Sequence, residues 1–335
     1  NTTANDNTAF GYTALLANTT GTRNTAVGAA ALDANTTAND NTALGYNGLT
    51  ANTTGTENTA IGSFTLQTNT TGNSNTGIGY NALEANTTGA LNVAVGRLTL
   101  DTNTTGAANT AVGAAALGAN TTAGSNTAVG FAAMEANTTG ANNTGVGRGS
   151  LGSNTTASSN TALGYFSLNA NTTGTNNTAV GYIAGDSITT GSYNTVLGSD
   201  SLRDSTTSSN NTAIGAAVMS LTTTGARNTA MGMAALQSNT SGNYNVAIGD
   251  QSVFRNTNGG ENTGVGFLAL QNSGLSTSGI SYNTGIGSRA LITNTSGAKN
   301  TAVGAYCLDS ITSGGNNVGM GYAAGDAATT AAGAT

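Results

Sequence analysis

Apolar and polar positions along the chain follow one pattern of seventeen residues. The pattern reads N-T-A-[VIL]-G-x-x-A-L-x-x-N-T-T-G-x-x, begins at Asn7 and returns every seventeen residues to Asn262. Four extra residues precede the last three copies, which begin at Asn283, Asn300 and Asn317. A fixed short period indicates one supersecondary unit stacked on copies of itself. We therefore expect residues 1–335 to form a single repeat domain of nineteen coils.

The repeat length and composition favour strands over helices. Seventeen residues are too few for the helical-pair repeats, which need about 33, and Asn, Thr and Gly are poor helix formers. The predicted fold is all-β, a parallel β-solenoid of the β-roll or β-helix type. Its coils would stack at about 4.8 Å, so that nineteen coils extend for about 90 Å.

The residues of positions two to four alternate as in a strand. Position four is apolar in every copy, from Phe10 and Val27 to Met320, whereas position three is Ala or Gly except at Val196. Alternation places Thr at position two and the aliphatic residue at position four on one face. We expect that face to be the core, together with Leu at position nine, and the small residues of position three to face outward.

Two positions never change. Asn at position one and Gly at position five occur in all nineteen copies. The Gly predicts a backbone bend that a Cβ would obstruct, and the stacked Asn side chains predict a hydrogen-bonded ladder. The Asn-Thr-Thr turn at positions twelve to fourteen predicts a second ladder, which drifts after Asn171 to Ile188, Ser205 and Thr222.

Composition narrows the function classes. The charged content is 7%, the net charge is −6, and no basic stripe is present, so neither disorder nor nucleic-acid binding is expected. No apolar run approaches the roughly 18 residues of a membrane span, so no membrane insertion is expected in this segment. The single Cys307 fills position eight, where a small buried residue is expected.

No chemistry-bearing constellation appears in the sequence. The chain has no His, the commonest general base and metal ligand. Carboxylates at position ten, Asp33, Glu84, Asp101 and Glu135, are interpreted as solvated surface charge. A calcium site would need Gly/Asp nonapeptides, which are missing. We therefore predict no enzyme, no cofactor and no catalytic, cofactor-binding or metal-binding residue.

Three surface patterns leave binding functions open. Aromatic residues recur at position six, for example Tyr12, Tyr46 and Tyr80, and are interpreted as exposed rings that shield the corner rather than a sugar-stacking ladder. The adjacent Thr residues of the second turn point oppositely, which disfavours an ice-binding array. The Asn-Thr-Thr sequons are interpreted as turn hydrogen bonding rather than glycosylation sites.

Two irregularities interrupt the pattern. Gly185 and Gly325 replace the Leu of position nine, which predicts a local break, bend or end of a segment. The four extra residues predict an outward loop at about 273–281, the place where a solenoid usually carries specific recognition.

The string Asn24-Thr-Ala-Val-Gly-Ala-Ala-Ala-Leu32 resembles two related families. One is the head β-roll of trimeric autotransporter adhesins; the other is the N-T-A-x-G-x-x-A-L-x-x-N-T-T-G arrays of phage tail-fibre-like and bacterial surface fibre proteins. The resemblance implies a left-handed coil and a homotrimer or filament. The residues alone leave handedness and chain number open, because the repeat is longer than in the adhesin heads and no coiled-coil stalk is present.

These observations predict a structural role. We expect an extracellular fibre or shaft segment, on a cell surface or virion, that extends and presents binding functions and is part of a longer chain. The alternative is a binding module whose repeated face contacts polysaccharide, a cell surface or ice. Self-association and a cell-surface glycan are the expected partners.

Overall fold

The predicted β-solenoid is confirmed. The computed structural model describes residues 3–273, 281–327, 329–330 and 333. Within them the protein is all-β, with nineteen strands of three residues each and no helix. Successive strands begin seventeen residues apart, except where the insertion separates Thr263 from Thr284. The chain divides into two compact units, Asn1–Phe166 and Ser167–Thr335.

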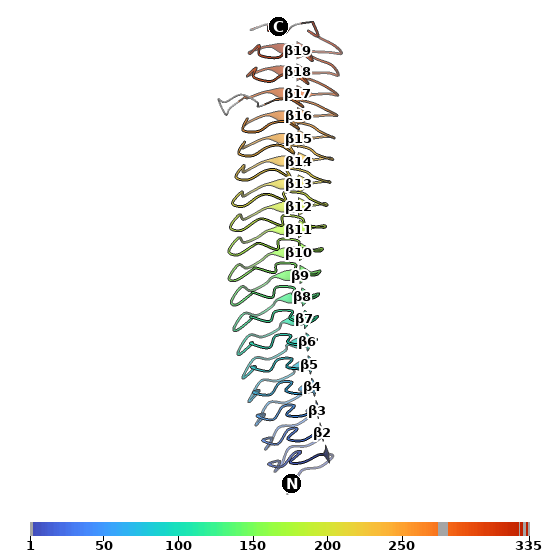
Figure 1. Cartoon of the computed structure of the whole chain (residues 1–335), viewed down its shortest axis with the longest axis vertical. Coiled ribbons are helices and arrows are strands. Elements are labelled where there is room, and N and C mark those ends of the chain that lie inside the picture. The colour runs from blue at the N-terminus through green and yellow to red at the C-terminus, as the bar shows by residue number, and fades with distance from the viewer. Residues whose placement is uncertain (1–2, 274–280, 328, 331–332, 334–335) are drawn as a thin grey trace. The chain divides into compact units, whose positions relative to one another are not determined.

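Unit 1 contains ten strands that pair in parallel and in chain order (Figure 1). The register is one repeat, so that each residue lies beside its equivalent seventeen positions later, as in Thr110↔Thr127. These strands are β1 (Thr8–Phe10), β2 (Thr25–Val27), β3 (Thr42–Leu44), β4 (Thr59–Ile61), β5 (Thr76–Ile78), β6 (Val93–Val95), β7 (Thr110–Val112), β8 (Thr127–Val129), β9 (Thr144–Val146) and β10 (Thr161–Leu163).

Unit 2 repeats this arrangement with nine strands in parallel register. They are β11 (Thr178–Val180), β12 (Thr195–Leu197), β13 (Thr212–Ile214), β14 (Thr229–Met231), β15 (Val246–Ile248), β16 (Thr263–Val265), β17 (Thr284–Ile286), β18 (Thr301–Val303) and β19 (Val318–Met320). Ser273 and Ser281 lie on either side of the insertion, and residues 274–280 of the predicted outward loop lie outside the described residues.

The Gly of position five forms the predicted bend. Gly113 has a φ of 129°, and a Cβ added to it would lie 2.5 Å from the carbonyl oxygen of Gly130 in the next coil. A side chain at this position would therefore be strained in its own backbone and would also collide with the neighbouring coil. This double constraint explains why the residue never changes.

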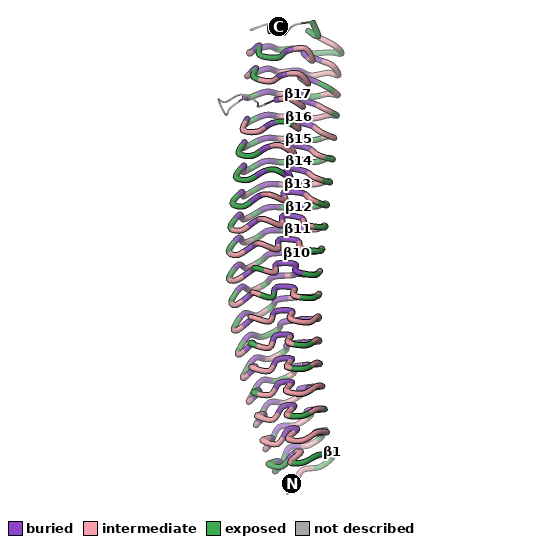
Figure 2. Tube along the Cα trace, viewed as in Figure 1, coloured by how far each residue is buried: buried purple, intermediate pink, exposed green. Residues whose placement is uncertain are grey.

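The prediction of which strand face is buried was wrong. The strand does alternate, but the small residue of position three points inward: Ala26 is fully buried, while Thr25 and Val27 on either side of it are half-exposed. The middle residue is likewise buried in β3 to β19, whereas all three residues of β1 are exposed. At position four, Leu44 and Leu163 are 48% and 46% exposed. Figure 2 shows buried segments alternating with half-exposed and exposed ones along every coil.

The Leu of position nine explains this inversion. A Cβ on Gly77, at position three, would lie 3.6 Å from Leu66 Cδ1 in the preceding coil, and one on Gly145 would lie 3.3 Å from Met134 Cε. Leu66 and Met134 are completely buried. Because this large side chain already fills the narrow interior, the strand facing it has room only for Ala or Gly.

The predicted break at Gly185 was also wrong. Gly185 keeps the left-handed conformation of the Leu that it replaces, with φ 60°, and its N–H donates to Ser201 O at 2.9 Å. Val196, the one large residue at position three, stands eleven residues later, the same offset that joins Gly77 to Leu66. Val196 and Ile188 are both buried, and a Cβ added to Gly185 would lie 3.0 Å from Ile188 Cδ1 and 3.2 Å from Leu168 Cδ2, so side chains already surround this position. The core is thus repacked without interruption.

The Asn ladder of position one is confirmed. The Oδ1 of each Asn accepts the backbone N–H of the Asn one coil later, as in Asn109 N–H to Asn92 Oδ1 at 3.0 Å. Its Nδ2 donates across the coil to the carbonyl of position fifteen, as in Asn92 to Gly106 at 2.9 Å. The side chain therefore satisfies a backbone donor that would otherwise be buried without a partner.

The second ladder is present but serves fewer backbone groups. Asn103 Nδ2 donates to Asn86 Oδ1 at 2.8 Å and to Gly106 O at 3.0 Å. Outside it, Thr residues of position thirteen donate their hydroxyls to the next coil, as in Thr104 to Thr121 O at 3.0 Å. The Oδ1 of Asn86 accepts only the side chain of Asn103, and where the Oδ1 of position twelve accepts a backbone N–H, as at Asn239 and Asn294, the donor lies in the same turn rather than in the next coil. Position twelve therefore tolerates the drift that position one does not.

Candidate functional surfaces

The four position-ten carboxylates of unit 1, Asp33, Glu84, Asp101 and Glu135, lie in different coils and do not converge. Asp33 accepts the hydroxyl of Thr50 at 3.0 Å, and Glu84 accepts the amide of Asn81. In the part of the chain that the structure describes, no three His, Cys, Asp or Glu side chains are grouped so that they could hold a metal ion.

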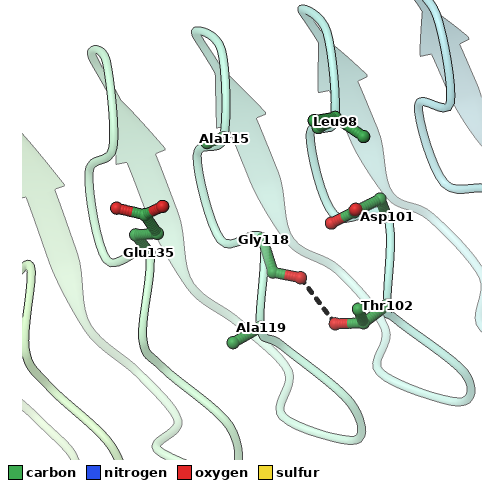
Figure 3. Close-up of a pocket in the computed structure, with 7 residues that line it drawn as sticks. All are labelled: Leu98, Asp101, Thr102, Ala115, Gly118, Ala119 and Glu135. Carbon is green, nitrogen blue, oxygen red and sulfur yellow. Dashed lines mark hydrogen bonds between the residues drawn. The ribbon is translucent and has the colours of Figure 1, made fainter.

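A hollow of about 300 Å³ opens where this row loses a side chain. Gly118 stands between Asp101 and Glu135, which lie one coil to either side, and Leu98 and Ala115 form its apolar wall (Figure 3). The Thr102 hydroxyl donates to Gly118 O at the foot of the hollow.

Asp101 is less solvated than the sequence suggested. Burial raises the pKa of its carboxyl, and the negative charge of Glu84 in the preceding coil raises it further. Hydrogen bonds from its own backbone N–H and from that of Thr102 act in the opposite direction on the pKa. The carboxylate is therefore a mildly destabilised charge at neutral pH rather than a free surface group.

The rings of position six are exposed, as predicted. Tyr12 and Tyr80 are 83% and 48% exposed. Phe64, at position seven of the intervening coil, meets Tyr46 and Tyr80 edge-to-face at centroid distances of 5.3 and 5.9 Å. These contacts run from coil to coil along the corner and hold the rings over it, which fits the shielding interpretation.

The Asn side chains of the sequons and Cys307 face the interior. Asn18, Asn52 and Asn86 are 2% exposed or less, so that in the folded chain they are closed to glycosylation. Cys307 is completely buried, as predicted, and burial raises the pKa of its thiol.

One repeated surface is the strand face that the sequence reasoning had assigned to the core. We call the outward side chains of positions two and four the outer strand face. Sixteen of the nineteen strands carry Thr at position two, the other three carry Val, and position four is apolar throughout. Neither row contains a charged residue. The outer strand face is therefore a pair of uncharged rows, one of hydroxyl-bearing and one of apolar side chains.

The signal that could have identified this face was the size of the inward residues. A Leu at position nine and a residue limited to Ala or Gly at position three are complementary in volume, whereas two rows of large aliphatics overfill a coil of seventeen residues. Apolar character alone pointed to the opposite face.

No protein-family model matches the chain, and no curated protein matches it. None of the described residues form a helix with the length and hydropathy that a membrane crossing needs.

Proposed function

We propose that this chain is a structural segment of an extracellular fibre, a shaft that extends and presents binding functions carried elsewhere. The proposal rests on one observation: the residues that never change hold the coils together, whereas the exposed residues vary. Asn at position one joins each coil to the next and closes its own coil, and Gly at position five allows the close approach of neighbouring coils. The exposed positions six, seven and ten vary from coil to coil.

Constant residues between coils and variable residues on the surface are what a protein needs when its role is to span a distance. Each added coil contributes the same parallel strand pairing and the same position-one Asn, so stability grows as a sum of neighbour terms. A binding or catalytic site would instead need several exposed side chains fixed together at one place. The exterior location and the homotrimeric or filamentous assembly rest on the resemblance to surface and tail-fibre proteins.

The test is to change the length by whole coils. Deletion of residues 75–108 removes two repeats and joins Ser74 to Asn109 in phase. We expect small-angle scattering of the full chain to give a maximum dimension of about 90 Å per assembly, and the deletion to shorten it by about 10 Å while the protein stays folded. A deletion of 22 residues, 83–104, is not a whole number of repeats; it serves as the mismatched control and should unfold.

Two results would contradict the proposal. One is a compact particle whose maximum dimension does not follow the number of coils. The other is an in-phase deletion that unfolds like the mismatched control. Solution mass measured on the same samples reports the number of chains, and protease treatment of intact cells or virions reports exposure of the segment.

A further inference from the structure

We propose that the outer strand face of unit 1 binds ice. This proposal goes beyond the shaft and does not depend on it. It starts from the most regular stretch of the face, where three consecutive coils present the same outward pair: Thr110 with Val112, Thr127 with Val129, and Thr144 with Val146.

The hydroxyls of these three Thr residues are not used by the protein. Among the residues that the structure describes, none of them has a protein hydrogen-bond partner. The Thr row of position thirteen differs, since Thr104 and Thr138 donate their hydroxyls to the next coil. The free hydroxyls of the outer strand face are thus available to ordered water.

The rows also have a fixed translation. Parallel pairing in register places Thr110, Thr127 and Thr144 directly beside one another. Neighbouring strands are spaced at about 4.8 Å, close to the repeat of equivalent oxygen atoms along the a axis of hexagonal ice. Water held by one hydroxyl therefore lies near a lattice translation of the water held by the next.

The chemistry of the face favours a crystalline water surface over a dry protein contact. A neutral lattice needs no opposite charge, and the two rows carry none. Burying a line of hydroxyls against the apolar surface of another molecule would cost free energy at each one that found no partner. The adjacent Val rows expose methyl groups, around which ordered water can form a continuous layer without competing for the hydroxyls.

The experiment uses the full chain and one matched pair of variants. Thr127→Lys places a charged side chain in the middle of the outer strand face, and Thr139→Lys makes the same change at an exposed turn position of the same coil. Thermal hysteresis and inhibition of ice recrystallisation are measured for each, with circular dichroism to verify folding and solution mass to count chains. We expect activity in the natural chain, a several-fold loss in Thr127→Lys and no loss in Thr139→Lys.

Three results would overturn the proposal. The first is that the natural chain shows neither hysteresis nor recrystallisation inhibition at high concentration. The second is that both variants lose activity equally, because ice would then bind elsewhere. The third is that the natural chain is an assembly without ice activity that Thr127→Lys dissociates, because the face would then be an interface between copies. None of these results bears on whether particle length follows coil number, so the shaft proposal is tested separately.

Discussion

Replacing Asn92 by Ala should destabilise the contact between neighbouring coils more than the same substitution at an Asn of the second ladder. Asn92 Oδ1 accepts the backbone N–H of Asn109 at 3.0 Å and the side-chain amide of Asn109 at 3.1 Å. Its Nδ2 donates to Asn75 Oδ1 and to Gly106 O. Removal leaves the N–H of Asn109 buried with no acceptor, whereas Gly106 O keeps a donor in Asn103 and Asn75 Oδ1 keeps the N–H of residue 92.

Asn86 is the matched control. It is as fully buried as Asn92, and its side chain also forms several hydrogen bonds. Its Nδ2 donates to Asn69 Oδ1 and to Gly89 O, and its Oδ1 accepts from Asn103 Nδ2. Removing it orphans only the Oδ1 of Asn69. The chain already tolerates such an atom, because Asn256 Oδ1 is buried without a partner.

The magnitude follows from the group left unpaired. A buried donor without an acceptor costs about 1–3 kcal/mol, and an orphaned N–H is rarer in proteins than an under-satisfied carbonyl. The cavities left by the two substitutions are equal in volume and cancel in the comparison. We therefore expect Asn92→Ala to destabilise the protein by about 1–2 kcal/mol more than Asn86→Ala.

Hydrogen exchange at the Asn109 amide reads this group directly, and guanidinium unfolding followed by circular dichroism gives the total effect. In Asn92→Ala the Asn109 amide should exchange about tenfold faster or more, since about 1.4 kcal/mol corresponds to a factor of ten. In Asn86→Ala its protection should be nearly unchanged. Equal costs for the two variants, or a larger cost for Asn86→Ala, would refute the assignment of the first ladder as the essential one.

Three further changes test the packing and the charge of the coil. Gly113→Ala should unfold or strongly destabilise the protein, because its Cβ would collide with the backbone of the next coil. Gly118→Ala is the control: its Cβ would meet nothing closer than 3.5 Å, so the free energy of unfolding should change by less than about 0.5 kcal/mol. Equal effects of the two substitutions would contradict the bend argument. Gly185→Leu should cost about 1–3 kcal/mol by overpacking, and adding Val196→Ala should recover most of it; additive costs would show that the two residues do not share volume. Asp101→Asn should raise the melting temperature at about pH 7 and do so less at about pH 3, as checked by thermal scans across this range.

The sign of the Asp101 effect follows from the direction of the pKa shift. Because the folded chain raises the pKa of this carboxyl, the folded state binds the proton more tightly than the unfolded state. The resulting stability is present at low pH and is lost as the pH rises through the folded-state pKa. A neutral amide removes the cost that the ionised form carries above that pH. A melting temperature that falls in Asp101→Asn at neutral pH would contradict the shift.

The sequence alone determined the repeat, the class of fold and the residues that hold coils together. A period of seventeen residues leaves stacking as the way for each copy to bury its apolar side chains, and the constancy of Asn92, Gly113 and their equivalents identified ladder and bend before any coordinates. The carboxylates of position ten were found as a row by the same phase argument. The burial of Asp101 was missed, because the phase of the repeat gives the position of a side chain but not how closely the surrounding coils cover it.

Which face of the strand is buried was decided only by the tertiary structure. Alternation of Thr25, Ala26 and Val27 is compatible with either side facing inward, and apolar character favoured the wrong one. The choice depends on volume across the coil: the buried Leu of position nine fills the interior, so Ala fits against it and Val does not. By the same volume argument we expect Gly185 and Val196 to compensate each other. Hydrophobic pattern sets the period of a solenoid, and the width of its interior sets which residues enter it.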